Sequence, residues 1–169
     1  TFRVFRYDMV ESLFSQLDME AEIVKATPGN IADLIHSLVT LGTPKPVWVE
    51  LITQYFCCKE VYSKLSGHDV VRITWAYAMT RIQDLQLMDS LSNVLCDPEQ
   101  LTDLSHEEAV RCFWSCIVLG YINVKVLNLL IKQIKFPHHL DCPVMDEQAW
   151  LQLIRSYHGC AQMSSPLGK

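Results

Sequence analysis

Two stretches of the chain repeat one spacing of residues. "LSGHDVVRITWAYA" occupies residues 65–78 and "LSHEEAVRCFWSCI" occupies residues 104–117. Each begins with Leu-Ser, has Val-Arg at its seventh and eighth letters, and has Trp three residues after the Arg. The two starts differ by 39 positions, and the alignment continues without a gap through Leu95 and Ile134. A fixed period of this length is typical of stacked repeat arrays.

The period extends to both sides of these two copies. "NIADLIHSLVTLG" at 30–42 aligns with "DVVRITWAYAMTR" at 69–81, at the same offset. "DEQAWLQLIRSYHGC" at 146–160 resembles "HEEAVRCFWSCIVLG" at 106–120 after a shift of 40. We therefore expect residues 1–169 to form a single helical-repeat domain. Its expected parts are a partial unit 1–25, units 26–64, 65–103 and 104–143, a partial unit 144–163 and a tail 164–169.

Each unit is predicted to contain two helices. In the first helix of the middle unit, apolar positions recur at i, i+3, i+4, i+7 and i+8, which is a one-sided stripe. The stripe consists of Val71, Thr74, Trp75, Ala78 and Met79, and we expect it to fill the seam between units. The second helices are predicted at about 46–56, 84–95 and 123–135.

Capping residues mark the ends of the first helices. Ser66 and Ser105 stand where an N-cap belongs, and Glu108, three residues after Ser105, completes a capping box. The predicted C-terminal ends are Gly42, Arg81 and Gly120. Residues 96–100 and 136–143 are predicted to be loops between units. Because no segment alternates with a period of two, the expected fold is all-α, an α-solenoid of stacked helical hairpins with a period of about 39 residues.

Composition limits the classes of function. Half of the 169 residues are apolar and a fifth are charged, as in globular domains. No apolar run approaches the ~18 residues of a membrane helix, so no membrane insertion is expected. A formal net charge of −5 argues against a domain that coats itself in nucleic acid.

Seven cysteines without a regular pairing pattern indicate reduced thiols, as in the cytosol, the nucleus or an organelle matrix. Since the first residue is Thr, we expect the natural start to lie upstream, which leaves targeting open.

The motif order resembles a known repeat family. Leu-Ser, four residues, a small aliphatic residue, W-A-x-A, a Leu-Gly corner and a leucine-rich second helix are similar to heptatricopeptide and octotricopeptide repeats. "ITWAYAMTRIQDLQLMDSLSNVL" at 73–95 is the closest copy. "CFWSCIVLGYINVKVLNLLIKQI" at 112–134 keeps the Trp and the Leu-Gly corner, while the first unit has His36 in place of the Trp.

The resemblance covers residues 30–162, and it implies an organellar RNA-associated α-solenoid of mitochondria or plastids. Short members of such families are components of divergent mitochondrial ribosomes. On this resemblance, we expect a non-catalytic subunit of an organellar ribonucleoprotein, most plausibly a mitochondrial ribosomal protein that contacts rRNA and neighbouring proteins. The expected location is the mitochondrial matrix, or alternatively the plastid. The alternative function is a protein–protein scaffold subunit of another mitochondrial complex, without RNA contact.

Two arginines at one repeat position are candidate RNA contacts. Arg72 and Arg111 align with each other in the middle and last units, and guanidinium groups repeated along a solenoid suit successive phosphates. The alternative is that each stem covers the neighbouring unit while its head pairs with an acidic loop. The first unit has Asp33 at this position.

A second candidate lies on the last predicted helix. Residues 122–140 contain no acidic residue, and four polar side chains fall on one helix face. These are Lys125, Asn128, Lys132 and Lys135. As the only sustained basic surface in the sequence, this face is the better candidate for phosphate contact. The alternative is an ordinary solvated helix face.

Metal binding and catalysis are not expected. Cys112 and Cys116 align with apolar residues of the middle unit and are predicted to be core residues. His138, His139 and Cys142 share a loop, but a structural zinc site needs two paired ligand clusters. Nucleophile-elbow, zinc-protease and P-loop motifs do not occur, so we predict no catalytic residues, no cofactor and no small-molecule substrate.

The four tryptophans divide into two pairs. Trp75 and Trp114 lie within the apolar stripe and are predicted to be buried between units. Trp48 and Trp150 are less constrained and are predicted to anchor a protein interface.

Overall fold

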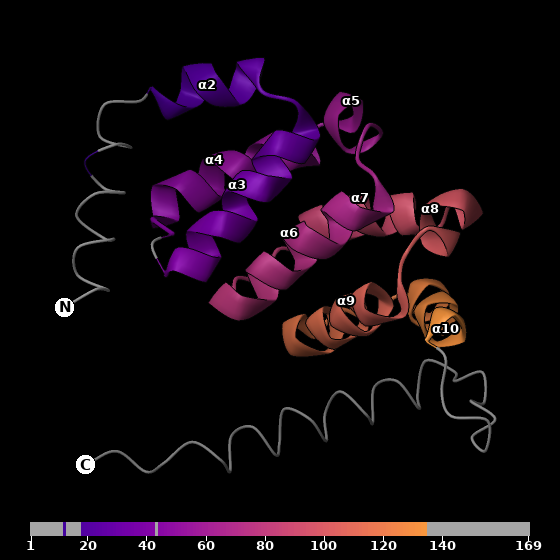
Figure 1. The fold of residues 1–169 in the computed structure, drawn as a ribbon. Helices are drawn as coiled ribbons and strands as arrows, with labels where there is room; N and C mark the ends of the chain where they lie inside the picture. The colour runs from indigo at the N-terminus through magenta and orange to yellow at the C-terminus, as the bar shows by residue number, and fades with distance from the viewer. Residues whose placement is uncertain (1–11, 13–17, 43, 135–169) are drawn as a thin grey trace, which may run out of the picture.

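The computed structural model describes residues 12, 18–42 and 44–134. All regular secondary structure in these ranges is α-helical (Figure 1), which confirms the all-α prediction. The helices are α2 (Met19–Lys25), α3 (Pro28–Leu41), α4 (Pro46–Cys57), α5 (Lys59–Tyr62), α6 (Gly67–Thr80), α7 (Leu85–Leu95), α8 (Pro98–Thr102), α9 (His106–Leu119) and α10 (Val124–Gln133). The expected partial unit 144–163, the tail 164–169 and most of the partial unit 1–25 lie outside the described residues.

Long helices recur at regular positions along the chain. The helices α3, α6 and α9 each have 14 residues, and they begin at residues 28, 67 and 106, which are 39 apart. Their partners α4, α7 and α10 begin at residues 46, 85 and 124, with the same spacing. These bounds agree with the predicted second helices to within two residues.

A short third helix precedes α6 and α9. The helix α5 ends shortly before α6, and α8 ends shortly before α9. The prediction of a loop at 96–100 was therefore wrong, because "DPE" starts the helix α8. The Asp97 side chain accepts a hydrogen bond from the Glu99 amide (3.1 Å), and Pro98 occupies the first helical position.

The capping residues define where the long helices begin and end. Ser66 and Asp69 form a capping box at α6, and Ser105 and Glu108 form the predicted one at α9. The three C-caps are left-handed, with φ of 73° at Gly42, 55° at Arg81 and 64° at Gly120.

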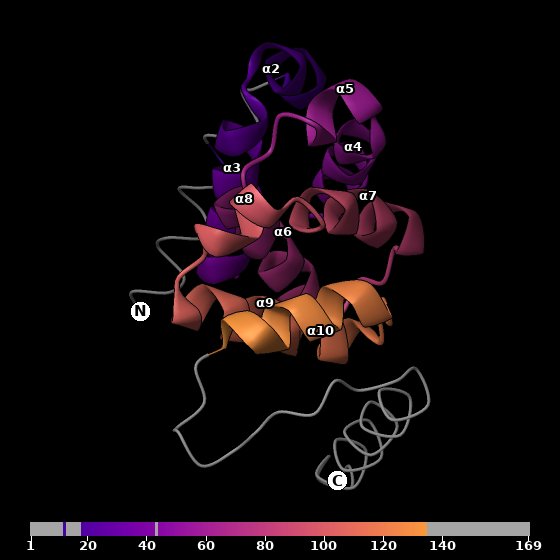
Figure 2. The same ribbon diagram turned by 90° about the vertical axis from the view of Figure 1, so that its right-hand side faces the viewer.

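The long helices form two sides of the molecule. The helix α6 packs against α3 and α9, and these three helices lie side by side in Figure 1. On the other side of them, α4 packs against α3, α7 against α6, and α10 against α9 (Figure 2). The core therefore runs between the two sides, and α6, at its centre, is buried on most of its circumference.

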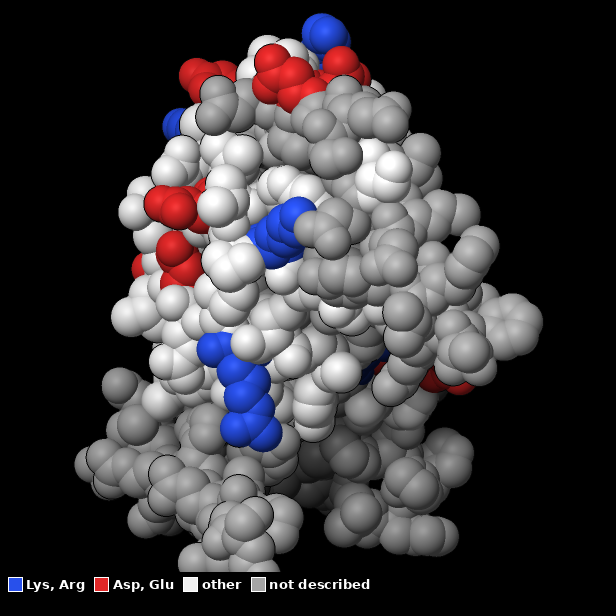
Figure 3. All heavy atoms as spheres, turned by 90° about the vertical axis from the view of Figure 1, so that its left-hand side faces the viewer, with Lys and Arg blue, Asp and Glu red and all other residues white. Residues whose placement is uncertain are grey.

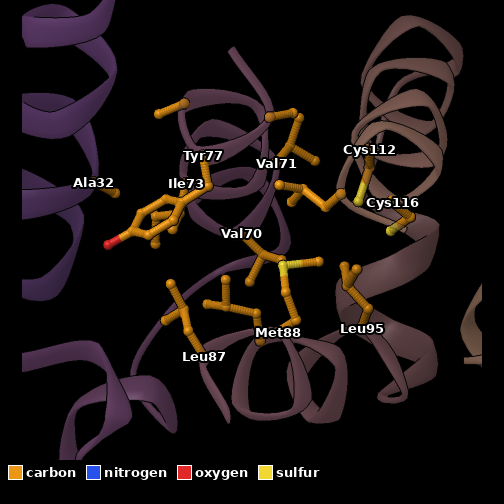
Figure 4. Close-up of a cluster of buried hydrophobic side chains, with 14 of the residues drawn as sticks. Ala32, Val70, Val71, Ile73, Tyr77, Leu87, Met88, Leu95, Cys112 and Cys116 are labelled. Atoms are coloured by element: carbon orange, nitrogen blue, oxygen red, sulfur yellow. The ribbon is translucent and has the colours of Figure 1, made fainter. Parts of the chain in front are cut away.

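The burial of individual side chains corrects the predicted stripe. Cys112 and Cys116 are 0% and 2% exposed, as predicted for core residues (Figure 4). Met79 is 51% exposed, whereas Val70, outside the stripe, is fully buried because α6 also packs against α7. Trp114 is 37% exposed, so the prediction that it is buried was wrong; no described helix covers that side of α9.

Candidate nucleic-acid interface

The lysines of α10 face away from the core. Asn123 caps the helix by accepting a hydrogen bond from the Val126 amide (3.2 Å). The leucines Leu127 and Leu130 are fully buried, and on the opposite side Lys125 and Lys132 are exposed. Asn128 is half-buried, and Lys135 lies outside the described residues. The structure thus brings two of the four predicted residues to one exposed face.

Charges around this face are mixed. Neither Lys125 nor Lys132 makes an ion pair within the described part of the chain. The neighbouring helix α8, however, carries Glu99 and is flanked by Asp97 and Asp103. The positive surface is consequently narrow, and it has carboxylates at its border.

Arg72 is held between two helices by carboxylates. Its Nε lies 3.3 Å from Asp33 Oδ1 on α3, and its Nη1 donates to Asp69 Oδ1 at 3.1 Å on α6. The Arg72 side chain is 41% exposed. This arrangement favours the alternative role, in which the arginine links neighbouring units, although its partners belong to helices instead of a loop. The sequence contained the signal, since Asp33 is at the same repeat position and Asp69 is three residues before Arg72.

Arg111 differs from Arg72 in its surroundings. It is exposed, and within the described residues it has no ion pair. Trp114 lies three residues further on the same helix surface and is partly exposed. Arg111 and Trp114 therefore present a guanidinium and an indole together. The guanidinium can bind a phosphate, and the indole can stack on an unpaired base.

An aromatic contact joins the first two units beside these arginines. The rings of His36 and Trp75, which occupy the same repeat position, have centroids 4.7 Å apart at an interplanar angle of 38°. Burial lowers the pKa of His36, and the nearby guanidinium groups of Arg111 and Arg72 lower it further. Burial first, and then the two guanidinium groups, therefore favour the neutral form of His36.

A hydrogen bond between two side chains links α6 to α9. His68 Nδ1 lies 2.7 Å from Glu108 Oε1, while the other carboxylate oxygen of Glu108 accepts from the Ser105 amide and hydroxyl. Burial acts to raise the pKa of Glu108, but the hydrogen bonds from Ser105 and His68 outweigh it and lower that pKa to about 2. The sequence analysis identified the cap and missed the contact with His68.

This pKa predicts a dependence of stability on pH. The charged form of Glu108 stabilises the fold, so its contribution is present above pH 4.5 and is lost as the pH falls toward 2. We expect Glu108→Gln to lower the free energy of unfolding at pH 7 by about 1–2 kcal/mol, measured by chemical denaturation. The difference from the unaltered chain should shrink as the pH falls below 4.5. Glu107→Gln, an equal charge change at the exposed neighbour, serves as the control; an equal loss there would contradict the assignment.

Charged groups are sparse on the face of the molecule that Figure 3 shows. The described Lys and Arg side chains stand apart from one another: those nearer the middle lie among uncharged atoms, whereas at the top a cation lies against carboxylates. The described residues therefore form no continuous basic surface on this face, and RNA contact would depend on small groups of cations.

The remaining predicted residues do not form a site. Trp48 is 8% exposed and has the Lys45 ammonium 5.2 Å from its ring centroid, so its ring belongs to the core instead of an open interface. Trp150 and the residues His138, His139 and Cys142 lie outside the described residues. Among residues 18–42 and 44–134, no group of three or more His, Cys, Asp and Glu side chains could hold a metal ion.

The two thiols of α9 are buried in the core. A hydrogen bond with Cys112 and burial raise the pKa of Cys116 well above its usual range. Such a thiol is a poor nucleophile at neutral pH. The pair therefore gives no support to a redox or catalytic role.

Comparison of the chain with protein-family models, curated proteins and solved structures found no match. In the described part of the chain, no helix combines the length and the apolar character needed to cross a bilayer. The function must therefore be argued from the repeat and its exposed side chains.

Proposed function

We propose that this chain is a non-catalytic α-solenoid subunit of an organellar ribonucleoprotein, most plausibly a mitochondrial ribosomal protein in the matrix. In this proposal, the hairpins α3–α4, α6–α7 and α9–α10 are successive units of the repeat predicted from the sequence. This assignment is supported by the equal spacing of the helix starts and of the left-handed C-caps. The sequence resemblance to heptatricopeptide and octotricopeptide repeats supports the organellar RNA context.

The observation that carries RNA contact is the set of exposed cations on the last unit. Lys125, Lys132 and Arg111 are exposed and make no ion pair among the described residues, whereas Arg72 is neutralised by two carboxylates. Trp114 adds an exposed ring beside Arg111. We therefore place RNA contact on α9 and α10, and we assign Arg72 to linking units.

A charge reversal tests this placement. Changing Lys125 and Lys132 to Glu is expected to weaken binding of structured RNA about tenfold at low salt. The slope of log K against log salt concentration should fall by about 1–2, since each phosphate contact releases counterions. Fluorescence anisotropy over a salt series measures both quantities.

The control uses two exposed lysines on the far unit. Lys59→Glu with Lys64→Glu changes the net charge by the same amount and should leave affinity within about threefold. Equal losses in both double variants would show that only net charge matters. RNA binding no stronger than that of an acidic control protein would overturn the RNA proposal for the isolated chain.

A second candidate is a protein-only scaffold. It is favoured by the net charge of −5 and by the exposed apolar side chains Val110 and Trp114 on α9. Sedimentation of native extracts separates the two functions. Co-migration with ribosomal subunits supports the first, and migration with a complex free of RNA supports the second.

A further inference from the structure

A groove of about 360 Å³ lies between α4 and the turn that precedes α7, two helices that pack against each other (Figure 2). Pro46, Val49 and Ile82 form its apolar walls. The carboxylates of Glu50 and Asp84 also line it, and neither makes an ion pair within residues 18–42 and 44–134. Apolar walls with a few polar groups are the usual form of a binding site for a small group.

The corresponding place in the next unit holds a tyrosine ring. Tyr121, at the repeat position of Ile82, is buried, and its hydroxyl lies 2.8 Å from Asp89 Oδ1. The same hydroxyl lies 3.0 Å from the Ser92 hydroxyl and accepts a hydrogen bond from the Asn123 side chain at 3.4 Å. The three residues that surround this hydroxyl have counterparts 39 positions earlier, and all three line the groove: Glu50, Thr53 and Asp84. The next unit therefore shows what kind of group these positions can hold.

The groove differs from its counterpart in charge and in hydrogen-bond donors. Where Asn123 supplies an amide donor, the groove has the Asp84 carboxylate, so it has two carboxylates where the next unit has one. The Thr53 hydroxyl is already hydrogen-bonded to the Val49 carbonyl and the Tyr77 hydroxyl, so its single proton is used within the fold. These three positions consequently offer acceptors and negative charge, and they suit a group that is a cation and only donates.

We propose that this groove binds an arginine side chain of a partner protein. A guanidinium has five N–H donors and no acceptor, and it is weakly hydrated, so it can bridge the two carboxylates while its aliphatic stem packs on Val49 and Ile82. Arg81, which directly precedes Ile82, pairs with neither carboxylate. The same carboxylates repel phosphate, so this contact is separate from the RNA contact placed on α9 and α10.

A short peptide titrated into the full chain tests this site. The probe is an acetylated and amidated pentapeptide with one arginine between two pairs of alanines. We expect it to shift the backbone amide NMR signals of residues 49–54 and 81–84, with half-saturation at about 1–10 mM. The same peptide with citrulline, an uncharged isostere of arginine, should bind at least about fivefold more weakly, because it loses both ion pairs.

Two matched double variants locate the binding on the chain. Glu50→Gln with Asp84→Asn should weaken the arginine peptide at least about fivefold, and asparagine preserves the cap of α7, as Asn123 caps α10. Asp97→Asn with Glu99→Gln makes the same charge change at the cap and first turn of α8, and it should leave affinity within about twofold.

Four results would overturn the proposal. They are the absence of a saturable shift at these amides, equal affinity for the citrulline peptide, and equal losses in the two double variants, which would mean that only net charge matters. The fourth is tighter binding of a peptide with tyrosine in place of arginine, which would assign the groove to an aromatic ring, as in the next unit.

Discussion

Replacing Gly67 by alanine is expected to lower the free energy of unfolding by about 2 kcal/mol. Gly67 is the first residue of α6, and a Cβ there would lie 2.5 Å from the backbone oxygen of Gln100 in α8. The Gly67 amide also donates to Gln100 Oε1 at 2.8 Å. Since the clash is with backbone, relief requires α8 to move away from α6. Urea denaturation of the variant and the unaltered chain measures the loss.

Gly29→Ala is the matched control. Gly29 lies in the first turn of α3, and a Cβ there would be 3.5 Å from the Asp69 carboxylate, an ordinary contact. Alanine at this position should therefore be neutral or slightly stabilising. A similar loss in both variants would mean that the effect comes from the helix turn and not from the approach of α8.

The bounds of the long helices follow from local signals, whereas the contacts of individual side chains do not. Ser66, Ser105 and Gly120 act through hydrogen bonds and backbone preferences within a few residues, so their roles are readable from sequence. The exposure of Trp114 depends on whether another element packs on that side of α9, and periodicity within one helix carries no such information.

The candidate RNA site shows the same division. Helical spacing predicts that Lys125 and Lys132 share an exposed face. Arg72 pairs with Asp33 of the preceding unit and with Asp69, whereas Glu108, at the position of Asp69, is bonded to Ser105 and His68 and not to Arg111. Comparing repeat positions across units would have found this pair, because side chains at equal positions meet where long helices pack side by side.

In two units, a hydroxyl at the same repeat position contacts a tyrosine hydroxyl, and the two tyrosines come from different positions. Thr53 and Ser92 occupy one repeat position, on α4 and α7. The Thr53 hydroxyl is hydrogen-bonded to the Tyr77 hydroxyl from within α6. The Ser92 hydroxyl instead accepts from Tyr121 (3.0 Å), which follows α9, while Cys116 occupies the position of Tyr77.

The residue after the helix also differs between the two arrangements. The Tyr121 hydroxyl also lies 2.8 Å from Asp89 Oδ1, and Tyr121 is 5% exposed. At its position the middle unit has Ile82, which is half-buried and leaves an open groove. The groove is lined by Pro46, Val49, Glu50, Thr53, Gln54, Ile82 and Asp84. In these two units, one large ring therefore reaches the hydroxyl, supplied either by the helix (Tyr77) or by the residue beyond it (Tyr121).

This exchange predicts a loss that a second substitution repairs. Tyr77→Cys should lower the free energy of unfolding by about 3 kcal/mol, because it empties a site that is 2% exposed. Adding Ile82→Tyr reproduces the arrangement of Cys116 and Tyr121, and it should recover at least about 1 kcal/mol. Ile82→Tyr alone should gain much less, since Tyr77 already bonds Thr53. Denaturation of the unaltered chain, the two single variants and the double variant gives the coupling free energy between residues 77 and 82. Strictly additive effects would show that the two tyrosine sites are not equivalent.

Ile82→Phe in the Tyr77→Cys chain separates the contribution of the ring from that of its hydroxyl. If Phe recovers less of the free energy of unfolding than Tyr does, the difference is assigned to the hydrogen bond.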